Sequence, residues 1–203
     1  IDWIEKNKSF EGSISFLITG DEEGPAINGT RKVLEWMEAS GQIPDMCVVG
    51  EPTNATKVGD TIKIGRRGSP NGSLTVYGEQ GHVAYPHLAL NPFPILMKML
   101  EPLLGGKLDD GTENFSPTNA SVTSIDTGNN AVNVIPSSVK AKFNIRFNDS
   151  QDKEKLESFL KSHFDKVYKN YETEFSCNAE PFITQPGKLI DVIKSAIIKK
   201  TNI

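Results

Sequence analysis

The first fifty residues combine two short apolar runs with one amphipathic stretch. Residues 13–19 are rich in β-branched and aromatic side chains and become apolar on both faces towards their end, and residues 46–49 are apolar. Between them, residues 27–39 place apolar side chains at helical spacing, and Gly41 follows as a termination residue. This order predicts a strand, a helix and a strand in a βαβ unit with a buried parallel sheet.

From residue 66 onward, apolar and polar positions alternate. Residues 139–147 place apolar side chains on one face and polar ones on the other, which is typical of an antiparallel sheet with one open face. Two helices are expected to cover the other face, at residues 91–104 and 150–167. Ser150 is expected to begin the second helix, whose apolar stripe comprises Leu156, Phe159, Leu160, Phe164 and Val167.

We therefore expect an α/β fold with an inserted domain. Residues 66–181 form an α+β domain with an antiparallel sheet and two helices, and residues 1–65 and 182–203 form the α/β domain into which it is inserted. The carboxyl ends of the two predicted parallel strands are where ligands bind in open α/β sheets.

Composition and charge narrow the function classes. The 203 residues are 37% hydrophobic and 24% charged, which excludes disorder as the main description. The net charge of −4 gives no field that would attract nucleic acid. No apolar run reaches the ~20 residues of a membrane span, and Cys47 and Cys177 are isolated, so we expect reduced cysteines and a cytoplasmic protein.

Four acids follow the predicted parallel strands. Asp21, Glu22 and Glu23 come after Gly20 at the end of the first strand, and Glu51 follows residues 46–49. Carboxylates at neighbouring strand ends can converge on one metal ion or one water molecule. They can equally be solvated acids that cap a helix or a turn, and the spacing leaves both interpretations open.

Further polar candidates lie in the second domain. His82 is flanked by glycine and proline and could ligate a metal or donate to an oxyanion, or bond to backbone. Arg66 and Arg67 could bind a carboxylate or form a solvated hinge. Asn133 and Arg146 are additional polar candidates. The other two histidines are expected to have structural roles, one in a loop and one packed on a helix.

Six motifs in this order resemble the co-catalytic zinc aminoacylase and carboxypeptidase family, most closely its succinyl-diaminopimelate desuccinylases. They are Leu-Ile-Thr-Gly-Asp-Glu-Glu (17–23), Val-Gly-Glu-Pro (49–52), Gly-Arg-Arg-Gly-Ser (65–69), Gln-Gly-His-Val-Ala-Tyr-Pro-His-Leu-Ala (80–89), Asn-Val-Ile-Pro (133–136) and Asn-Ile-Arg-Phe (144–147). The resemblance implies that the α/β part is an incomplete zinc-peptidase-like catalytic domain and that residues 66–181 are its lid, or dimerisation, domain.

The resemblance also implies roles for the candidate residues. Glu22 would be the general base, and Glu23 and Glu51 would be ligands of two Zn²⁺ ions per subunit, with Co²⁺ as an alternative metal. His82 would reach the site of a partner subunit in a homodimer and stabilise the oxyanion. Asn133 and Arg146 would contact substrate. Arg66 and Arg67, with Arg146, suit an anionic substrate that carries several carboxylates.

The implied reaction is hydrolysis of N-succinyl-L,L-diaminopimelate to succinate and L,L-diaminopimelate, in bacterial lysine biosynthesis. The resemblance places the family's His-x-Asp motif and bridging aspartate before residue 1 and its distal histidine ligand after residue 203, so we expect an internal fragment that is inactive alone. The His-x-Asp triplet at 163–165 lies in the expected helix of the second domain and cannot replace them. Two alternatives stay open: a deacylase of another N-acyl amino acid such as acetylornithine, and a non-catalytic dimerisation module.

Overall fold

The computed structural model describes residues 2–20, 26–177 and 179–201. The chain divides into two compact units, Ile1–Pro52 and Thr53–Ile203. No described helix is long and apolar enough to cross a membrane.

The first unit contains helices α1 (Asp2–Lys6) and α2 (Thr30–Ala39). Helix α2 begins three residues later than the expected 27 and ends as predicted. Gly41 has a positive φ of 67°, its N–H donates to the Glu38 carbonyl, and the N–H of Gln42 donates to the Met37 carbonyl. These two bonds satisfy carbonyls that the last helical turn would otherwise leave unpaired.

The predicted parallel strands are wrong for the described residues of this unit. Neither residues 13–19 nor residues 46–49 belong to a strand, and Ile18 and Val49 are 91% and 74% exposed. A parallel strand that is apolar on both faces needs neighbouring strands and covering helices. The described part of the unit supplies no strand partner for either segment, so their apolar pattern does not become a sheet.

The second unit is built on a four-stranded antiparallel sheet with the order β4-β6-β2-β7. A short ladder pairs β3 with β5, and another pairs β1 with β8. The strands are β1 (Gly65–Arg66), β2 (Pro70–Tyr77), β3 (Gly81–His82), β4 (Asn119–Asp126), β5 (Val134–Ile135), β6 (Ser138–Arg146), β7 (Tyr171–Cys177) and β8 (Phe182–Ile183). The helices are η1 (Pro86–Leu88), α3 (Pro92–Leu104), α4 (Lys153–Val167) and α5 (Lys188–Thr201).

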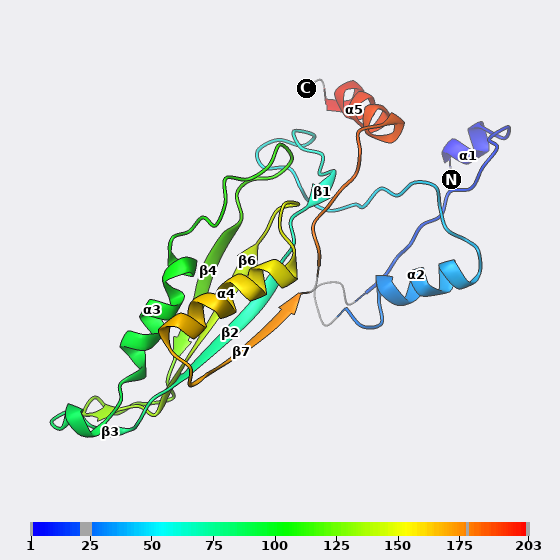
Figure 1. Cartoon of the computed structure of the whole chain (residues 1–203). Helices are drawn as coiled ribbons and strands as arrows, with labels where there is room; N and C mark the ends of the chain where they lie inside the picture. Colours follow the sequence, from blue (N-terminus) through cyan, green and yellow to red (C-terminus); the bar gives the residue numbers. More distant parts are fainter. Residues whose placement is uncertain (1, 21–25, 178, 202–203) are drawn as a thin grey trace. The chain divides into compact units, whose positions relative to one another are not determined.

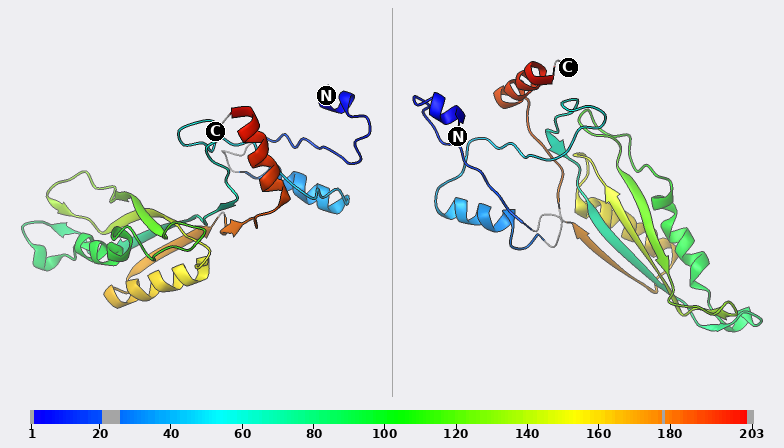
Figure 2. Two further views of the ribbon diagram at one scale, coloured as in Figure 1. Left: turned by 90° about the horizontal axis from the view of Figure 1, so that it is seen from above. Right: turned by 180° about the vertical axis from the view of Figure 1, so that it is seen from behind.

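Helices α3 and α4 cover one face of the sheet, and the other face is open (Figure 1). The right-hand view of Figure 2 shows the sheet in front of α4. Strand β6 alternates as predicted: Val139, Ala141, Phe143 and Ile145 are buried. The mixed α/β class and the antiparallel sheet with two helices are therefore confirmed.

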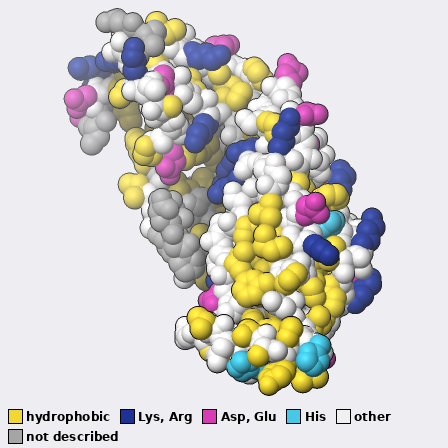
Figure 3. Space-filling view, turned by 90° about the vertical axis from the view of Figure 1, so that its left-hand side faces the viewer, with side chains coloured by type: hydrophobic (Ala, Val, Ile, Leu, Met, Phe, Trp, Pro, Cys, Tyr) yellow, Lys and Arg dark blue, Asp and Glu magenta, His cyan; other side chains and the backbone are white. Residues whose placement is uncertain are grey.

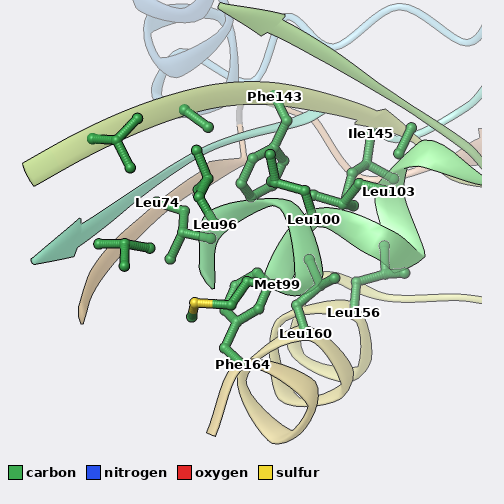
Figure 4. Packing of buried hydrophobic residues seen from close by; sticks show 14 of the residues in the cluster. Leu74, Leu96, Met99, Leu100, Leu103, Phe143, Ile145, Leu156, Leu160 and Phe164 are labelled. Carbon is green, nitrogen blue, oxygen red and sulfur yellow. The ribbon is translucent and has the colours of Figure 1, made fainter. Parts of the chain in front are cut away.

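The core lies between the sheet and the two helices (Figure 4). Leu96 and Leu100 of α3 lie against Phe143 of the sheet, and Met99 lies beside Phe164 of α4. Burying each such side chain stabilises the fold by about 1.5–3 kcal/mol.

Two details of α4 differ from the prediction. The N-cap is Asp152, whose carboxylate accepts from the Lys155 N–H, in place of Ser150. The hydroxyl of Ser150 instead donates to Asn148 Oδ1, which holds it in the preceding turn. Phe159 is 51% exposed, so the apolar stripe is narrower than expected.

The β1–β8 ladder joins the two ends of the predicted insertion. Gly65 pairs with Ile183 and Arg66 with Phe182. An inserted domain needs adjacent entry and exit segments, and this ladder provides them. The boundaries at residues 66 and 181 stay a prediction.

Candidate functional site

The predicted metal-binding acids lie in the first unit. Glu22 and Glu23 fall outside the described residues. Glu51 is exposed and follows the segment that was expected to be a strand. Across the residues that the structure describes, no three side chains of His, Cys, Asp or Glu are gathered in a way that could hold a metal ion.

Arg66 and Arg67 have different surroundings. Arg66 is exposed at the end of β1. Arg67 is half-buried, and its Nη1 donates to the Pro117 carbonyl at 3.1 Å and to Asn119 Oδ1 at 2.8 Å. The guanidinium of Arg67 is thus fixed to the start of β4, while that of Arg66 is accessible.

Asn119 connects Arg67 to Arg146. In the β4–β6 ladder, Asn119 is the register partner of Arg146, so the two side chains share a face of the sheet. Arg146 is exposed at the last position of β6. The structure therefore brings Arg67 and Arg146 together at one end of the open face.

His82 and Asn133 meet at the other end of the sheet. His82 is the register partner of Val134 in the β3–β5 ladder, and the Val83 N–H donates to the Asn133 carbonyl at 3.1 Å. Both His82 and Asn133 are exposed. This ladder brings the backbone segments that carry His82 and Asn133 together, although the two residues are fifty positions apart in the sequence.

The tautomer of the neutral His82 ring is set by a hydrogen bond within its own loop. The Ala84 N–H donates to His82 Nδ1 at 3.1 Å. Because Nδ1 accepts this bond, the neutral imidazole carries its proton on Nε2. The ring of Tyr85 lies 6.1 Å from that of His82, between centroids. His82 thus presents an N–H donor on Nε2, as a group that stabilises an oxyanion must.

The two groups of candidates are far apart within one chain. Strand β6 has 9 residues and separates the Arg67 and Arg146 end from the His82 and Asn133 end. At a rise of ~3.3 Å per residue, the separation is about 25 Å. One small molecule therefore cannot contact both groups of the same chain.

The other two histidines have structural surroundings. His87 is exposed in η1, with its ring 6.4 Å from that of Tyr85. His163 Nε2 lies 3.1 Å from the Lys98 carbonyl, and because a carbonyl only accepts, the imidazole donates this bond between α4 and α3.

Sequence reasoning missed Asn119 and a buried polar network around Asp109. Asp109 Oδ1 accepts from the N–H groups of Gly111 and Thr118 and from Asn148 Nδ2, at 2.8–2.9 Å. Asn148 is fully buried. This network holds the loop that ends at Pro117, the acceptor of Arg67. The Asp-x-Gly spacing at 109–111 indicates a turn, but it contains no information about partners 39 residues away.

Comparisons with known proteins place this geometry in context. The sequence model of the peptidase dimerisation domain matches residues 64–172. A succinyl-diaminopimelate desuccinylase of Beijerinckia indica is 51% identical over 99% of this chain and 53% of its own length. That of Orientia tsutsugamushi, strain Ikeda, is 48% identical over 99% of this chain and 52% of its length. The chain thus spans about half the length of the curated relatives it matches.

Solved structures share the fold at low sequence identity. A tripeptidase of Staphylococcus aureus has a TM-score of 0.53 at 15% identity, over 69% of this chain and 37% of that chain. An M20 family metallo-carboxypeptidase of Sulfolobus solfataricus has a TM-score of 0.52 at 17% identity, over 66% of this chain and 50% of that one. The sequence relatives confirm the resemblance inferred from the six motifs.

Proposed function

Because this chain belongs to the peptidase dimerisation domain family, we propose that it is part of a metal-dependent amide hydrolase that acts on N-succinyl-L,L-diaminopimelate. The observation that carries the proposal is identity of 48–51% over 99% of the chain to proteins named succinyl-diaminopimelate desuccinylase. The products would be succinate and L,L-diaminopimelate, and the enzyme would act in the cytoplasm.

The described residues do not by themselves form a zinc site. Glu51 is one exposed carboxylate, and a zinc site needs three or four ligands, usually with imidazole among them. We therefore derive no step through the metal from this structure. Glu23 and Glu51 as ligands of Zn²⁺ or Co²⁺, and Glu22 as the base that takes a proton from the attacking water, are proposals supported by the motif resemblance.

The arginine end of the sheet suits the carboxylates of such a substrate. Guanidinium groups bind carboxylates through paired N–H donors. Arg66 and Arg146 are exposed and can offer these donors directly. Nη1 of Arg67 already donates to Pro117 and Asn119. Arg67 would therefore bind substrate through its charge and its remaining N–H groups.

The histidine end suits stabilisation of a tetrahedral intermediate. His82 would donate from Nε2 to the oxyanion, and the Asn133 amide, from the segment paired with β3, would contact substrate. Since about 25 Å separates these residues from Arg146 in one chain, we propose that each site takes His82 and Asn133 from one copy and Arg66, Arg67 and Arg146 from the other. A homodimer is then a requirement for catalysis.

An exposed apolar face supports pairing of two copies. Figure 3 shows hydrophobic side chains gathered on the side of the unit that carries the histidines. Phe93 and Met97 of α3 are 39% and 46% exposed, and Leu88 of η1 is 69% exposed. Apolar patches of this kind on a soluble protein commonly mark protein interfaces.

Two alternatives remain open. A deacylase of another N-acyl amino acid, such as acetylornithine, would use the same residues with a less acidic substrate. A dimerisation module without catalysis would use only the apolar face. The desuccinylase is favoured because relatives that are 48–51% identical over 99% of this chain carry that name.

The test is turnover by a full-length protein, meaning this chain within a polypeptide as long as its relatives. We expect hydrolysis of N-succinyl-L,L-diaminopimelate in preference to acetylornithine, and no turnover by the present chain alone. His82→Ala should lower kcat about 10²–10³-fold, as loss of one oxyanion donor does. His87→Ala is the matched control and should leave kcat unchanged. Preference for acetylornithine, or equal effects of the two histidine variants, would contradict the proposal.

A further inference from the structure

The open face of the sheet carries a polar groove of about 440 Å³. It lies over β2, β4 and β6 and the turn after β4. None of the predicted site residues lines it. Its lining residues are Thr75, Ser124, Asp126, Thr127, Gly128, Ser138, Lys140 and Lys142. The volume falls within the range of small-molecule sites, about 300–1,000 Å³.

The two lysines of the groove lie on one strand and one face. Lys140 and Lys142 are two positions apart on β6, so their Cα atoms are roughly 7 Å apart and their side chains rise from the same side of the sheet. Among the described residues, neither ammonium group has a carboxylate within 4.0 Å, so no ion pair neutralises either charge.

The acids near the groove are bonded elsewhere. Asp126 is the register partner of Lys140, but its Oδ1 accepts from the Gly128 N–H at 2.8 Å. On β7, Glu172 accepts from the Tyr77 hydroxyl at 2.8 Å. Glu174 accepts from the Ser73 hydroxyl at 3.4 Å. Each acid lowers the local potential, but none neutralises a lysine by direct contact.

Neutral donors complete the lining of the groove. In the described structure, the hydroxyl groups of Thr75, Ser124 and Ser138 make no hydrogen bond, and Thr127 Oγ1 only accepts, from the Asn129 N–H at 3.0 Å. All four hydroxyls can therefore donate into the groove. Two unpaired ammonium groups with several hydroxyl donors form a favourable environment for oxyanions.

We propose that this groove binds a small oxyanion, carried by a phosphate or by a dicarboxylate, between Lys140 and Lys142. The bound anion offsets the repulsion between the two ammonium groups and accepts bonds from the hydroxyls around them. The proposal is independent of the proposed hydrolase activity, because it rests on β6 side chains that have no part in that reaction.

The test is titration of the present chain with inorganic phosphate and, separately, malonate, followed by amide NMR at constant ionic strength in chloride. We expect saturable shifts confined to residues 124–128 and 138–142. Lys140→Ala/Lys142→Ala should weaken binding about tenfold or abolish saturation. Lys140→Arg/Lys142→Arg should retain binding.

A matched control removes two exposed lysines from the helices, Lys98→Ala/Lys166→Ala, and should bind as the unaltered chain does. The lysines concerned are at the surface, so all variants should keep the native amide spectrum. If only one of the two anions saturates the groove, the result shows whether the groove binds phosphate or a dicarboxylate. Diffuse shifts that do not saturate, or binding unaffected by Lys140→Ala/Lys142→Ala, would overturn the proposal.

Discussion

His82 and Arg67 show two ways in which the fold prepares a side chain for chemistry. For His82 the determinant is local: the Ala84 N–H donates to His82 Nδ1, which leaves the proton of the neutral ring on Nε2. For Arg67 the determinants are distant, since its guanidinium donates to Pro117 and Asn119 on another strand. The hydrogen bond to His82 comes from within its own Gly-His-Val-Ala segment and could be inferred from it. The partners of Arg67 lie at the start of β4 and could not be inferred without the β4–β6 register.

Asp109 should contribute to stability in a pH-dependent manner. Burial raises the pKa of Asp109, but hydrogen bonds from Thr118, Gly111 and Asn148 outweigh that effect and hold the pKa below its ordinary value of 3.8. Asp109→Asn removes the charged acceptor, so we expect a loss of about 1–3 kcal/mol in the free energy of unfolding at pH 7.

The sign of the pH dependence follows from the lowered pKa. The carboxylate stabilises the fold above the unfolded-state pKa, and this contribution is lost as the pH falls from about 3.8 through the folded-state pKa. Urea unfolding at pH 7 and pH 3 should therefore show a smaller difference between the chain and Asp109→Asn at pH 3. Asp110→Asn is the matched control. A difference that grows on acidification would contradict this account.

At the scale of elements, periodicity predicted the second unit well and the first unit poorly. The alternation of β6 follows from the sequence because it depends on the order of residues along that strand alone. The start of α3 follows in the same way, because its cap is local: the Asn91 side chain accepts from the Phe93 N–H. Residues 13–19 and 46–49 could form strands only beside neighbouring strands, and the sequence of each segment does not say whether such neighbours are present. Register, and with it the pairing of Asn119 with Arg146, is likewise a property of two strands together.

Helix α4 offers a direct comparison between a buried and an exposed apolar residue. Leu160 is fully buried against α3 and the sheet, whereas Phe159 is 51% exposed. Leu160→Ala should lower the free energy of unfolding by about 2–5 kcal/mol because it leaves a cavity. Phe159→Ala should cost less than about 1 kcal/mol. Urea denaturation monitored by circular dichroism checks both, and equal losses would show that α4 packs on a different face.

At the scale of the whole molecule, the second unit carries two groups of candidate residues at opposite ends of one sheet. The sequence offered these residues as candidates, and the structure shows how they are distributed: arginines at one end of β6, His82 and Asn133 at the other. Motifs in a single sequence do not reveal that separation. The distribution is the physical reason to propose that two copies share each active site.

The most direct test of the shared site mixes two variants of the full-length protein that are each expected to lose most turnover, His82→Ala and Arg146→Ala. In a mixed dimer, one site receives the intact His82 of one copy and the intact Arg146 of the other, and the second site has neither. After subunit exchange, half of the dimers are mixed, so we expect recovery of about a quarter of the unaltered turnover. Turnover that stays at the level of the separate variants, under conditions where sedimentation shows mixed dimers, would contradict the shared site.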